Sequence, residues 1–296
     1  DGSPLYTLAV AVDDVLMKVT HVLRGEDLLS STPRQIRVYQ AMGLALEDYP
    51  VFAHLPFVMG QDNAKLSKRN GEVSIAWYRD KGFLPEAICN YLALLGWSPG
   101  DDRENVTMKE LTELFTVEKV HSSPARFDMK KLEAINGDKI RALTIDEFLD
   151  WSLPFLTKAG VITGTADEIA LVKLALPLIQ ERIIMLSEVP AMLKFLFVKN
   201  FAVEADSVAK ITDDASKQVL QRSLKELEPL ATWNHDSIEA ALRSSLIEEM
   251  GLKPRIAFGA VRIATTGSTI SPPLFESMEL LGKEASLARI RAGLEL

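Results

Sequence analysis

From residue 145 to its C-terminus, the chain shows the apolar spacing of helices throughout. Polar residues that can cap a helix stand at predicted starts, and glycines that can end one follow several of these segments. The sequence therefore predicts an all-helical domain over residues 145–296, with a possible subdivision near residue 200. The predicted helices are Ile145–Ala159, Ala166–Glu181, Glu188–Lys199, Asp206–Ile211, Asp213–Leu224, His235–Met250 and Pro273–Leu281, the caps Thr144, Ser187, Thr212 and Asn234, and the stops Gly160, Gly251 and Gly282.

The first 72 residues show a different pattern, in which short apolar runs alternate with turn signals. Leu5–Val12 is a near-continuous apolar run, typical of a buried strand, and Leu16–Leu23 is predicted as a second strand. Thr32 and Pro33 then predict the start of a helix, and Val51–Met59 is predicted as a third strand. This order is half of a nucleotide-binding, Rossmann-like α/β fold.

The segment between these two parts, residues 73–144, is predicted to be mainly helical. Ser74 can cap one helix, and Pro85 can open the next. Thr107 and Glu110 have the spacing of a capping box. We therefore expect an α/β part followed by mostly α structure, with domains at 1–72, 73–144 and 145–296.

The composition limits what kind of protein this can be. The chain has 296 residues, of which 47% are hydrophobic and 25% charged, as in an ordinary soluble globular protein. No apolar run reaches the roughly 18 residues that span a bilayer. The single cysteine, Cys89, excludes an internal disulfide, and the four histidines are too dispersed to predict a zinc site. The net charge of −8 argues against a general nucleic-acid binder but leaves room for a local basic face.

One short loop carries most of the chemical signal in the first part. Lys65, Lys68 and Arg69 surround Ser67 and lie between two apolar segments. Such a cationic loop can hold a polyanionic phosphate, where preorganised charges stabilise a developing pyrophosphate. The alternative is a solvated basic turn.

Arg24 is the second candidate for a binding residue. It follows a predicted strand at its carboxyl end, where ligands bind in open α/β sheets. An arginine there can bind a carboxylate with two parallel hydrogen bonds. The alternative is a salt bridge from Arg24 to Glu26 or Asp27.

A basic belt surrounds the segment Ser122–Asp128 and consists of Lys119, His121, Arg126, Lys130, Lys131, Lys139 and Arg141. A solvated helix face would explain these charges equally well.

Several motifs together resemble one enzyme family. Lys65–Arg69 is similar to the lysine-serine-lysine loop of class I aminoacyl-tRNA synthetases, and the other motifs narrow the likeness to bacterial-type glutamyl-tRNA synthetases. The resemblance runs from end to end and is most specific in the first half. Its further motifs are Asp1–Tyr6, Val12–Asp14, His21–Asp27, Ser31–Gln35, Gly82–Ala87, Asn90–Leu92, Leu95–Ser98, Ser122–Asp128 and Ser271–Glu276.

The resemblance implies an activity and the residues that serve it. The family joins glutamate to its tRNA in protein synthesis, using ATP and Mg²⁺ and, in this chain, no zinc. Arg24 and Tyr6 would hold glutamate. Lys65 and Lys68 would stabilise the pyrophosphate leaving group beside Ser67, and Arg69 would contact ATP.

The resemblance also implies that tRNA(Glu) binds across the later part of the chain. Arg126 would touch the inner corner of the tRNA, and Arg182 and Arg262 would approach anticodon nucleotides. Pro273, Leu274 and Phe275 would offer an apolar platform. Arginine side chains can stack on and hydrogen-bond to splayed bases. For Arg182, a surface salt bridge is the alternative.

The chain opens inside a family motif and contains no His-x-Gly-His motif, which the first half of the family's ATP site carries. We therefore expect a C-terminal fragment of a cytoplasmic, monomeric synthetase that does not catalyse alone. The alternatives are a non-catalytic tRNA-binding module, a relative that modifies a tRNA base and a glutaminyl-tRNA synthetase. The helical second half argues against the last two.

Overall fold

The computed structural model describes residues 2–60, 66, 74–121, 123–198 and 200–296. The chain forms two compact units. One consists of Asp1–Trp77 with Pro85–Ile135, and the other of Tyr78–Leu84 with Asn136–Leu296. The second unit therefore takes a short segment from the middle of the first unit's sequence. The three-part division at residues 72 and 144 stays a prediction.

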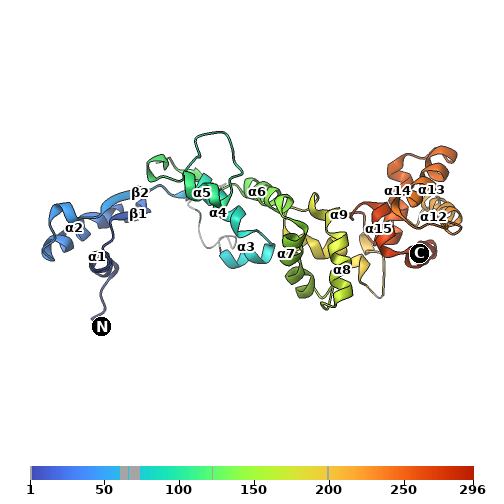
Figure 1. Cartoon of the computed structure of the whole chain (residues 1–296), viewed down its shortest axis with the longest axis horizontal. Coiled ribbons are helices and arrows are strands. Elements are labelled where there is room, and N and C mark those ends of the chain that lie inside the picture. Colours follow the sequence, from blue (N-terminus) through green and yellow to red (C-terminus); the bar gives the residue numbers. More distant parts are fainter. Residues whose placement is uncertain (1, 61–65, 67–73, 122, 199) are drawn as a thin grey trace. The chain divides into compact units, whose positions relative to one another are not determined.

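The first unit begins with alternating helices and strands (Figure 1): α1 (Tyr6–Leu16), β1 (His21–Gly25), α2 (Thr32–Ala41) and β2 (Val51–Leu55). The strands β1 and β2 pair in parallel, with Arg24 opposite His54. A 3-10 helix, Glu26–Ser31, leads from the end of β1 into α2. The expected α/β character of this part is confirmed, as a partial sheet with helices.

The predicted strand Leu5–Val12 is wrong, because these residues belong largely to α1. Continuous apolar runs cannot be assigned by periodicity alone. In the helix, Ala11 is fully buried, and α1 packs against α2. Tyr39 of α2 donates its hydroxyl hydrogen to Asp14 over 3.2 Å, which adds a polar contact to this pair. The second predicted strand is correspondingly short and begins only at His21.

The predicted strand Val51–Met59 is divided at Pro56 into β2 and β3 (Val58–Met59). The strand β3 pairs in parallel with β4 (Ala125–Arg126). The unit continues with α3 (Ile75–Lys81), α4 (Pro85–Leu94) and α5 (Met108–Leu114). The predicted caps Ser74 and Thr107 are confirmed. Trp77 donates its N–H to Ser74 Oγ, and Thr107 forms the expected capping box with Glu110.

The remaining helices are α6 (Met129–Ala142), α7 (Ile145–Lys158), α8 (Ala166–Ala175), α9 (Pro177–Gln180), α10 (Val189–Leu193), α11 (Ala205–Val208), α12 (Asp214–Leu227), α13 (His235–Leu242), α14 (Pro254–Thr266), α15 (Leu274–Leu281) and α16 (Lys283–Leu294). A π-helix, Arg243–Glu249, continues α13. The all-helical prediction for residues 145–296 is confirmed, with α14 and α16 additional to the predicted helices. The helix α6 lies in the segment 73–144, which was predicted to be mainly helical.

The helix caps were predicted with mixed success. Thr144 and Asn234 cap α7 and α13 as expected. Thr212 is not a cap, because Asp213 accepts the N–H of Ser216 at the start of α12. Ser187 lies inside a 3-10 turn, Leu186–Glu188, that precedes α10. The predicted helix end at Lys199 lies outside the described residues.

The helices α12 to α16 enclose one hydrophobic core, which fixes the arrangement of the C-terminal region. Its fully buried members include Leu220, Leu242, Val261, Met278 and Ile290. Figure 1 shows these helices grouped near the C-terminus. The motif Ser271–Glu276 begins in the loop between α14 and α15. This core therefore positions the predicted anticodon residues.

Within the second unit, Asn136 holds the segment Tyr78–Leu84 in place. Its side-chain oxygen accepts the N–H of Leu84 over 2.8 Å, and its amide nitrogen donates to the carbonyl oxygen of Ile184 over 2.6 Å. Asn136 is fully buried, and a buried amide of this kind is stabilised only when such partners are present.

Candidate functional site

Arg24 and its neighbours form the best-defined polar site in the first unit. Because β1 and β2 are parallel, Arg24 and the opposing His54 both lie near the carboxyl ends of their strands. The Nε of Arg24 donates to His54 Nε2 over 3.3 Å. Its Nη2 donates to Thr32 Oγ1 over 2.8 Å and to Gln35 Oε1 over 2.7 Å. A strand end and the first turn of α2 thus converge on one guanidinium group.

The charge of this guanidinium is not balanced by any carboxylate among the described residues. Arg24 is half-buried, and its hydrogen-bond partners are all neutral. Glu26, the first alternative partner, instead accepts the N–H of Phe57 over 3.4 Å. Burying an uncompensated cation is costly, so this site is suited to an anionic ligand.

Aromatic residues complete the site. The guanidinium carbon of Arg24 lies 5.4 Å from the ring centre of Phe52, within the range of a cation–π contact. Phe52 in turn stacks with Tyr39. Burial, reinforced by the charge of Asp14, raises the pKa of Tyr39 to about 12, so its hydroxyl stays protonated.

Tyr6, the second residue expected to hold glutamate, lies beside Arg24. Its hydroxyl oxygen accepts a long hydrogen bond of 3.4 Å from Arg24 Nη1, and the tyrosine is 48% exposed. The structure thus brings together the two predicted substrate residues. Their role in binding glutamate stays a prediction.

The cationic loop is the predicted catalytic element, and most of it lies outside the described residues. This applies to Lys65, Ser67, Lys68 and Arg69. Leu66 is described, and its N–H donates to the carbonyl oxygen of Val58 in β3 over 3.0 Å.

In the second unit, Arg262 projects from α14 into the loop that precedes α15. Its Nη1 donates to Ser271 Oγ over 2.6 Å and to the carbonyl oxygen of Pro272 over 2.8 Å. Burial, and to a smaller extent the charge of Arg182, lowers the pKa of Arg262. The positive charges of these two predicted anticodon residues therefore act on each other. Arg182 is exposed, and the described residues give it no salt bridge.

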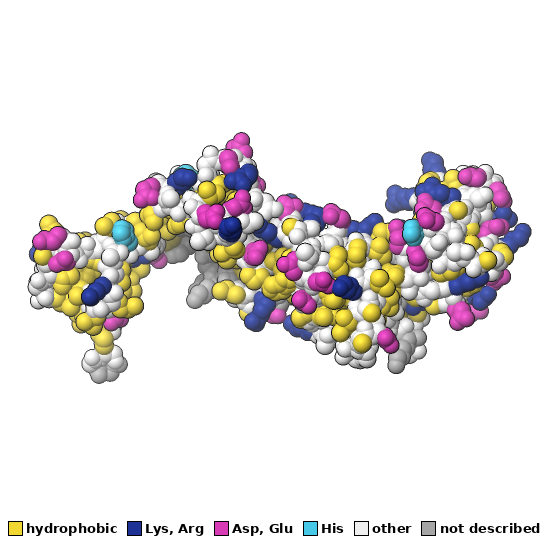
Figure 2. Space-filling view, in the orientation of Figure 1, with side chains coloured by type: hydrophobic (Ala, Val, Ile, Leu, Met, Phe, Trp, Pro, Cys, Tyr) yellow, Lys and Arg dark blue, Asp and Glu magenta, His cyan; other side chains and the backbone are white. Residues whose placement is uncertain are grey.

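The predicted apolar platform is only partly at the surface. Leu274 is 3% exposed and belongs to the core of the C-terminal helices, so it cannot stack on a nucleotide. Pro273 and Phe275 are half-buried, and Phe275 makes an edge-to-face contact with Phe258. Figure 2 shows Lys and Arg side chains gathered over α13 and α14, next to acidic ones.

The basic belt is partly neutralised in the structure. Lys131 pairs with Glu104 over 2.7 Å, and Arg141 pairs with Asp138. Lys139 is buried rather than solvated. Arg126 is exposed and lies on β4, opposite Met59. The alternative of a solvated, ion-paired surface therefore describes some of the belt, and tRNA contact by Arg126 stays a prediction.

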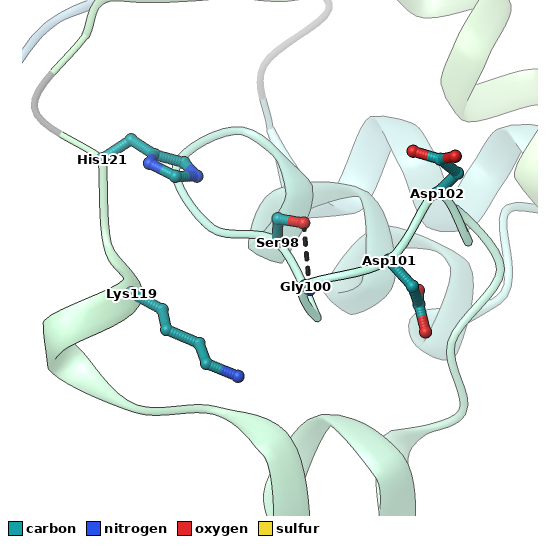
Figure 3. Close-up of a pocket in the computed structure, with 6 residues that line it drawn as sticks. All are labelled: Ser98, Gly100, Asp101, Asp102, Lys119 and His121. Carbon is teal, nitrogen blue, oxygen red and sulfur yellow. Dashed lines mark hydrogen bonds between the residues drawn. The ribbon is translucent and has the colours of Figure 1, made fainter.

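Two belt residues, Lys119 and His121, line a pocket of about 420 Å³ (Figure 3). They come from the segment after α5, while the facing residues follow α4: Ser98, Gly100, Asp101 and Asp102. Asp101 is paired with Arg103 over 2.8 Å, and Ser98 Oγ accepts the N–H of Gly100. No local pattern of residues predicted this pocket, because its two sides are brought together only by the fold.

Among the described residues, no His, Cys, Asp or Glu side chains form a group of three or more that could hold a metal ion. Within the same residues, every helix is too short or too polar to cross a membrane.

Comparison with known proteins identifies both halves of the chain. Residues 1–134 match the catalytic domain of class I tRNA synthetases for glutamate and glutamine (E and Q). Residues 129–294 match an anticodon binding domain. Glutamate--tRNA ligases from Saccharopolyspora erythraea and an Arthrobacter species are 50% and 51% identical, each over 99% of this chain. The chain belongs to the glutamyl-tRNA synthetase family.

The structural comparison agrees with this membership. A crystal structure of a glutamate tRNA ligase from Elizabethkingia meningosepticum, in complex with its amino acid, has a TM-score of 0.80 and 28% identity. The match covers 100% of this chain and 61% of that one. The chain likewise spans 59% of the length of both synthetase relatives named above.

Proposed function

We propose that this chain forms part of a glutamate–tRNA ligase and supplies its glutamate-recognition residues, its cationic loop and its anticodon-binding domain. The observation that carries this proposal is the arrangement around Arg24. A half-buried guanidinium at a strand end, held by neutral partners alone, is suited to a ligand carboxylate. Tyr6 lies beside it and can also contact the ligand.

In the proposed reaction, a carboxylate oxygen of glutamate attacks the α-phosphorus of ATP and pyrophosphate leaves. A hydroxyl at the tRNA 3′ end then attacks the activated carbonyl carbon and AMP leaves. Lys65 and Lys68 would stabilise the negative charge that develops on the pyrophosphate, with Ser67 and Arg69 beside them. Magnesium enters this proposal only as an ion carried by ATP.

The second unit would bind tRNA(Glu). The anticodon-binding family match and the closeness of Arg182 to Arg262 support this part of the proposal. Two like charges held near each other lower the cost of bringing a phosphate or an electron-rich base to them. Arg126 would contact another part of the tRNA. We place the complete enzyme in the cytoplasm as a monomer, as is usual for the family.

The experiment that tests the catalytic role is ATP–pyrophosphate exchange, measured in a complete ligase that carries this chain. Lys68→Ala should reduce glutamate-dependent exchange strongly and leave the Kd for tRNA nearly unchanged. Lys81→Ala, outside the loop, is the control and should retain exchange. If Lys68→Ala exchanges at the wild-type rate, the loop has no catalytic role.

The tRNA role can be tested on the chain itself. Binding of tRNA(Glu) is compared with a copy that has a substituted anticodon and with an unrelated tRNA, at two salt concentrations. A preference for the cognate anticodon supports the proposal. Equal binding of all three would remove the anticodon role from this chain.

A further inference from the structure

We propose that Thr32 and Gln35 are positioning residues for Arg24, and that they leave Nη1 as the nitrogen that binds the ligand carboxylate. The inference rests on the proposed function, because that function supplies the carboxylate. The inference goes beyond the proposed function by naming the nitrogen of Arg24 that binds the carboxylate and the two side chains that select this nitrogen.

The assignment follows from where the N–H groups of Arg24 are used. Nη2 carries two hydrogens and has three acceptors: Thr32 Oγ1, Gln35 Oε1 and, at 3.3 Å, the carbonyl oxygen of Leu28. Nε has one hydrogen, which is donated to His54. Nη1 has two hydrogens and only one long contact, to the Tyr6 hydroxyl. The spare donor capacity of the guanidinium therefore lies at Nη1.

The first turn of α2 is built to keep Nη2 occupied. Thr32 and Gln35 stand three residues apart, so both reach the same side of the helix. Gln35 is fully buried, yet its amide nitrogen has no hydrogen-bond partner in the described part of the structure. A buried unsatisfied donor is costly. The contact that this side chain does make is the 2.7 Å bond to Arg24, which gives it a role as an acceptor.

His54 completes the arrangement on the other side. Its Nε2 lies 3.3 Å from Arg24 Nε and 3.2 Å from Thr32 Oγ1. Since Arg24 can only donate, Nε2 must be an unprotonated acceptor, and the imidazole is neutral with its hydrogen on Nδ1. Thr32 can then accept from Arg24 Nη2, while its hydroxyl hydrogen shares the single Nε2 lone pair of His54 with Arg24 Nε. The pairing of neutral groups preserves the full charge of Arg24 for its ligand.

This geometry changes the expected mode of binding. Because Nε and Nη2 already donate to protein acceptors, neither Nη1 with Nη2 nor Nε with Nη2 can offer a carboxylate the two parallel hydrogen bonds expected from sequence without breaking one of these contacts. We infer an end-on contact from Nη1, beside the Tyr6 hydroxyl. Binding then depends on how the guanidinium is oriented, because Nη1 has one hydrogen for the carboxylate while the other is directed at the Tyr6 hydroxyl.

The test uses a complete ligase that carries this chain, assayed by ATP–pyrophosphate exchange with glutamate and ATP varied separately. Gln35→Met and Thr32→Val should each raise the KM for glutamate about tenfold or more, with the KM for ATP changed less than twofold, because a charge-assisted hydrogen bond is lost. Thr32→Ser keeps the hydroxyl and should restore a KM near that of the wild type. Gln40→Met, on the exposed side of α2, is the matched control.

Gln35→Glu gives a sharper test. It preserves the shape and the acceptor but adds a negative charge beside Arg24, so it should raise the KM for glutamate more than Gln35→Met does. Unfolding midpoints of all variants identify any that fail to fold, in which case the Thr32→Val and Thr32→Ser pair decides.

Equal changes in KM for glutamate and ATP, or a wild-type KM in both Gln35→Met and Thr32→Val, would overturn the positioning role. A wild-type ligase without glutamate-dependent exchange would instead overturn the proposed function. The two failures are therefore distinguishable.

Discussion

Leu186 donates its backbone N–H to the carbonyl oxygen of Gly82 over 3.1 Å, and no side chain fits between the two residues. A Cβ at position 82 would lie 2.6 Å from that same nitrogen. Gly82 also has a φ of +84°, in the left-handed region that favours glycine. The close approach and the turn therefore both require this residue.

Gly82→Ala should destabilise the second unit by about 2–4 kcal/mol, the sum of a left-handed alanine and an overpacked contact. Urea unfolding followed by circular dichroism measures the change. Gly164→Ala is the control, because Gly164 has a φ of +91° with no atom near its missing Cβ. It should lose only the smaller backbone cost. Equal losses in the two variants would show that the contact with Leu186 has no weight.

Asn136→Ala should be similarly severe, at about 3–5 kcal/mol, because it leaves the buried N–H of Leu84 and the partly buried carbonyl oxygen of Ile184 without the Asn136 side chain as partner. The unfolding midpoint in urea reports the loss. Asn105→Ala, at an exposed position, should stay within about 0.5 kcal/mol of the wild type. A mild effect at Asn136 would mean that water replaces the amide.

Glu168 should make the start of α8 sensitive to acid. Hydrogen bonds from the backbone of Thr165, and also from Thr163, lower the pKa of Glu168 from 4.5 to about 2. A lowered carboxyl pKa stabilises the fold above the unfolded value of 4.5, and that stabilisation is lost as the pH falls toward 2. NMR titration of the carboxyl carbon should show the low midpoint.

The same effect predicts how a variant behaves. The difference in unfolding midpoint between the wild type and Glu168→Gln should shrink as the pH is lowered from 4.5 to 2. A constant difference across this range would contradict a role for the charge.

Substitutions of Arg182 and Arg262 should differ in their effects on tRNA binding and on stability. Arg182→Ala removes an exposed cation and should weaken binding of tRNA(Glu) about tenfold without changing the unfolding midpoint. Arg262→Ala should lower the midpoint as well, because Ser271 and Pro272 lose their shared donor. Arg291→Ala, which removes an exposed salt bridge to Glu228, is the control for nonspecific charge loss. Unchanged binding in Arg182→Ala would support the alternative of a surface role.

The sequence predicted structural features, such as helix caps, that depend only on residues close together in the chain. The predicted capping box at Thr107 and the predicted cap at Thr144 involve residues only three positions apart, and both form. The apolar run in α1 was mistaken for a strand because its partner, α2, is not visible in a local pattern.

Around Arg24, too, the sequence predicted the residue with a local signal but not the partners that the fold brings to it. Arg24 could be found from its strand end, but His54 joins it only through the parallel pairing of β1 and β2. Thr32 and Gln35 did leave a signal, a polar pair at helical spacing at the start of the predicted helix. That signal becomes interpretable only once α2 is known to face Arg24.

The placement of Tyr78–Leu84 in the second unit has a consequence for synthesis on the ribosome. These residues leave the exit tunnel well before Asn136 and Ile184, the groups that hold them. The whole sequence of the first unit is therefore translated before the partners of this segment. If the gene is divided between residues 135 and 136, Tyr78–Leu84 stays on the product that carries the first unit, although it belongs to the second. To express either unit alone, this segment must be moved to the second unit's sequence, because truncation does not separate the two units.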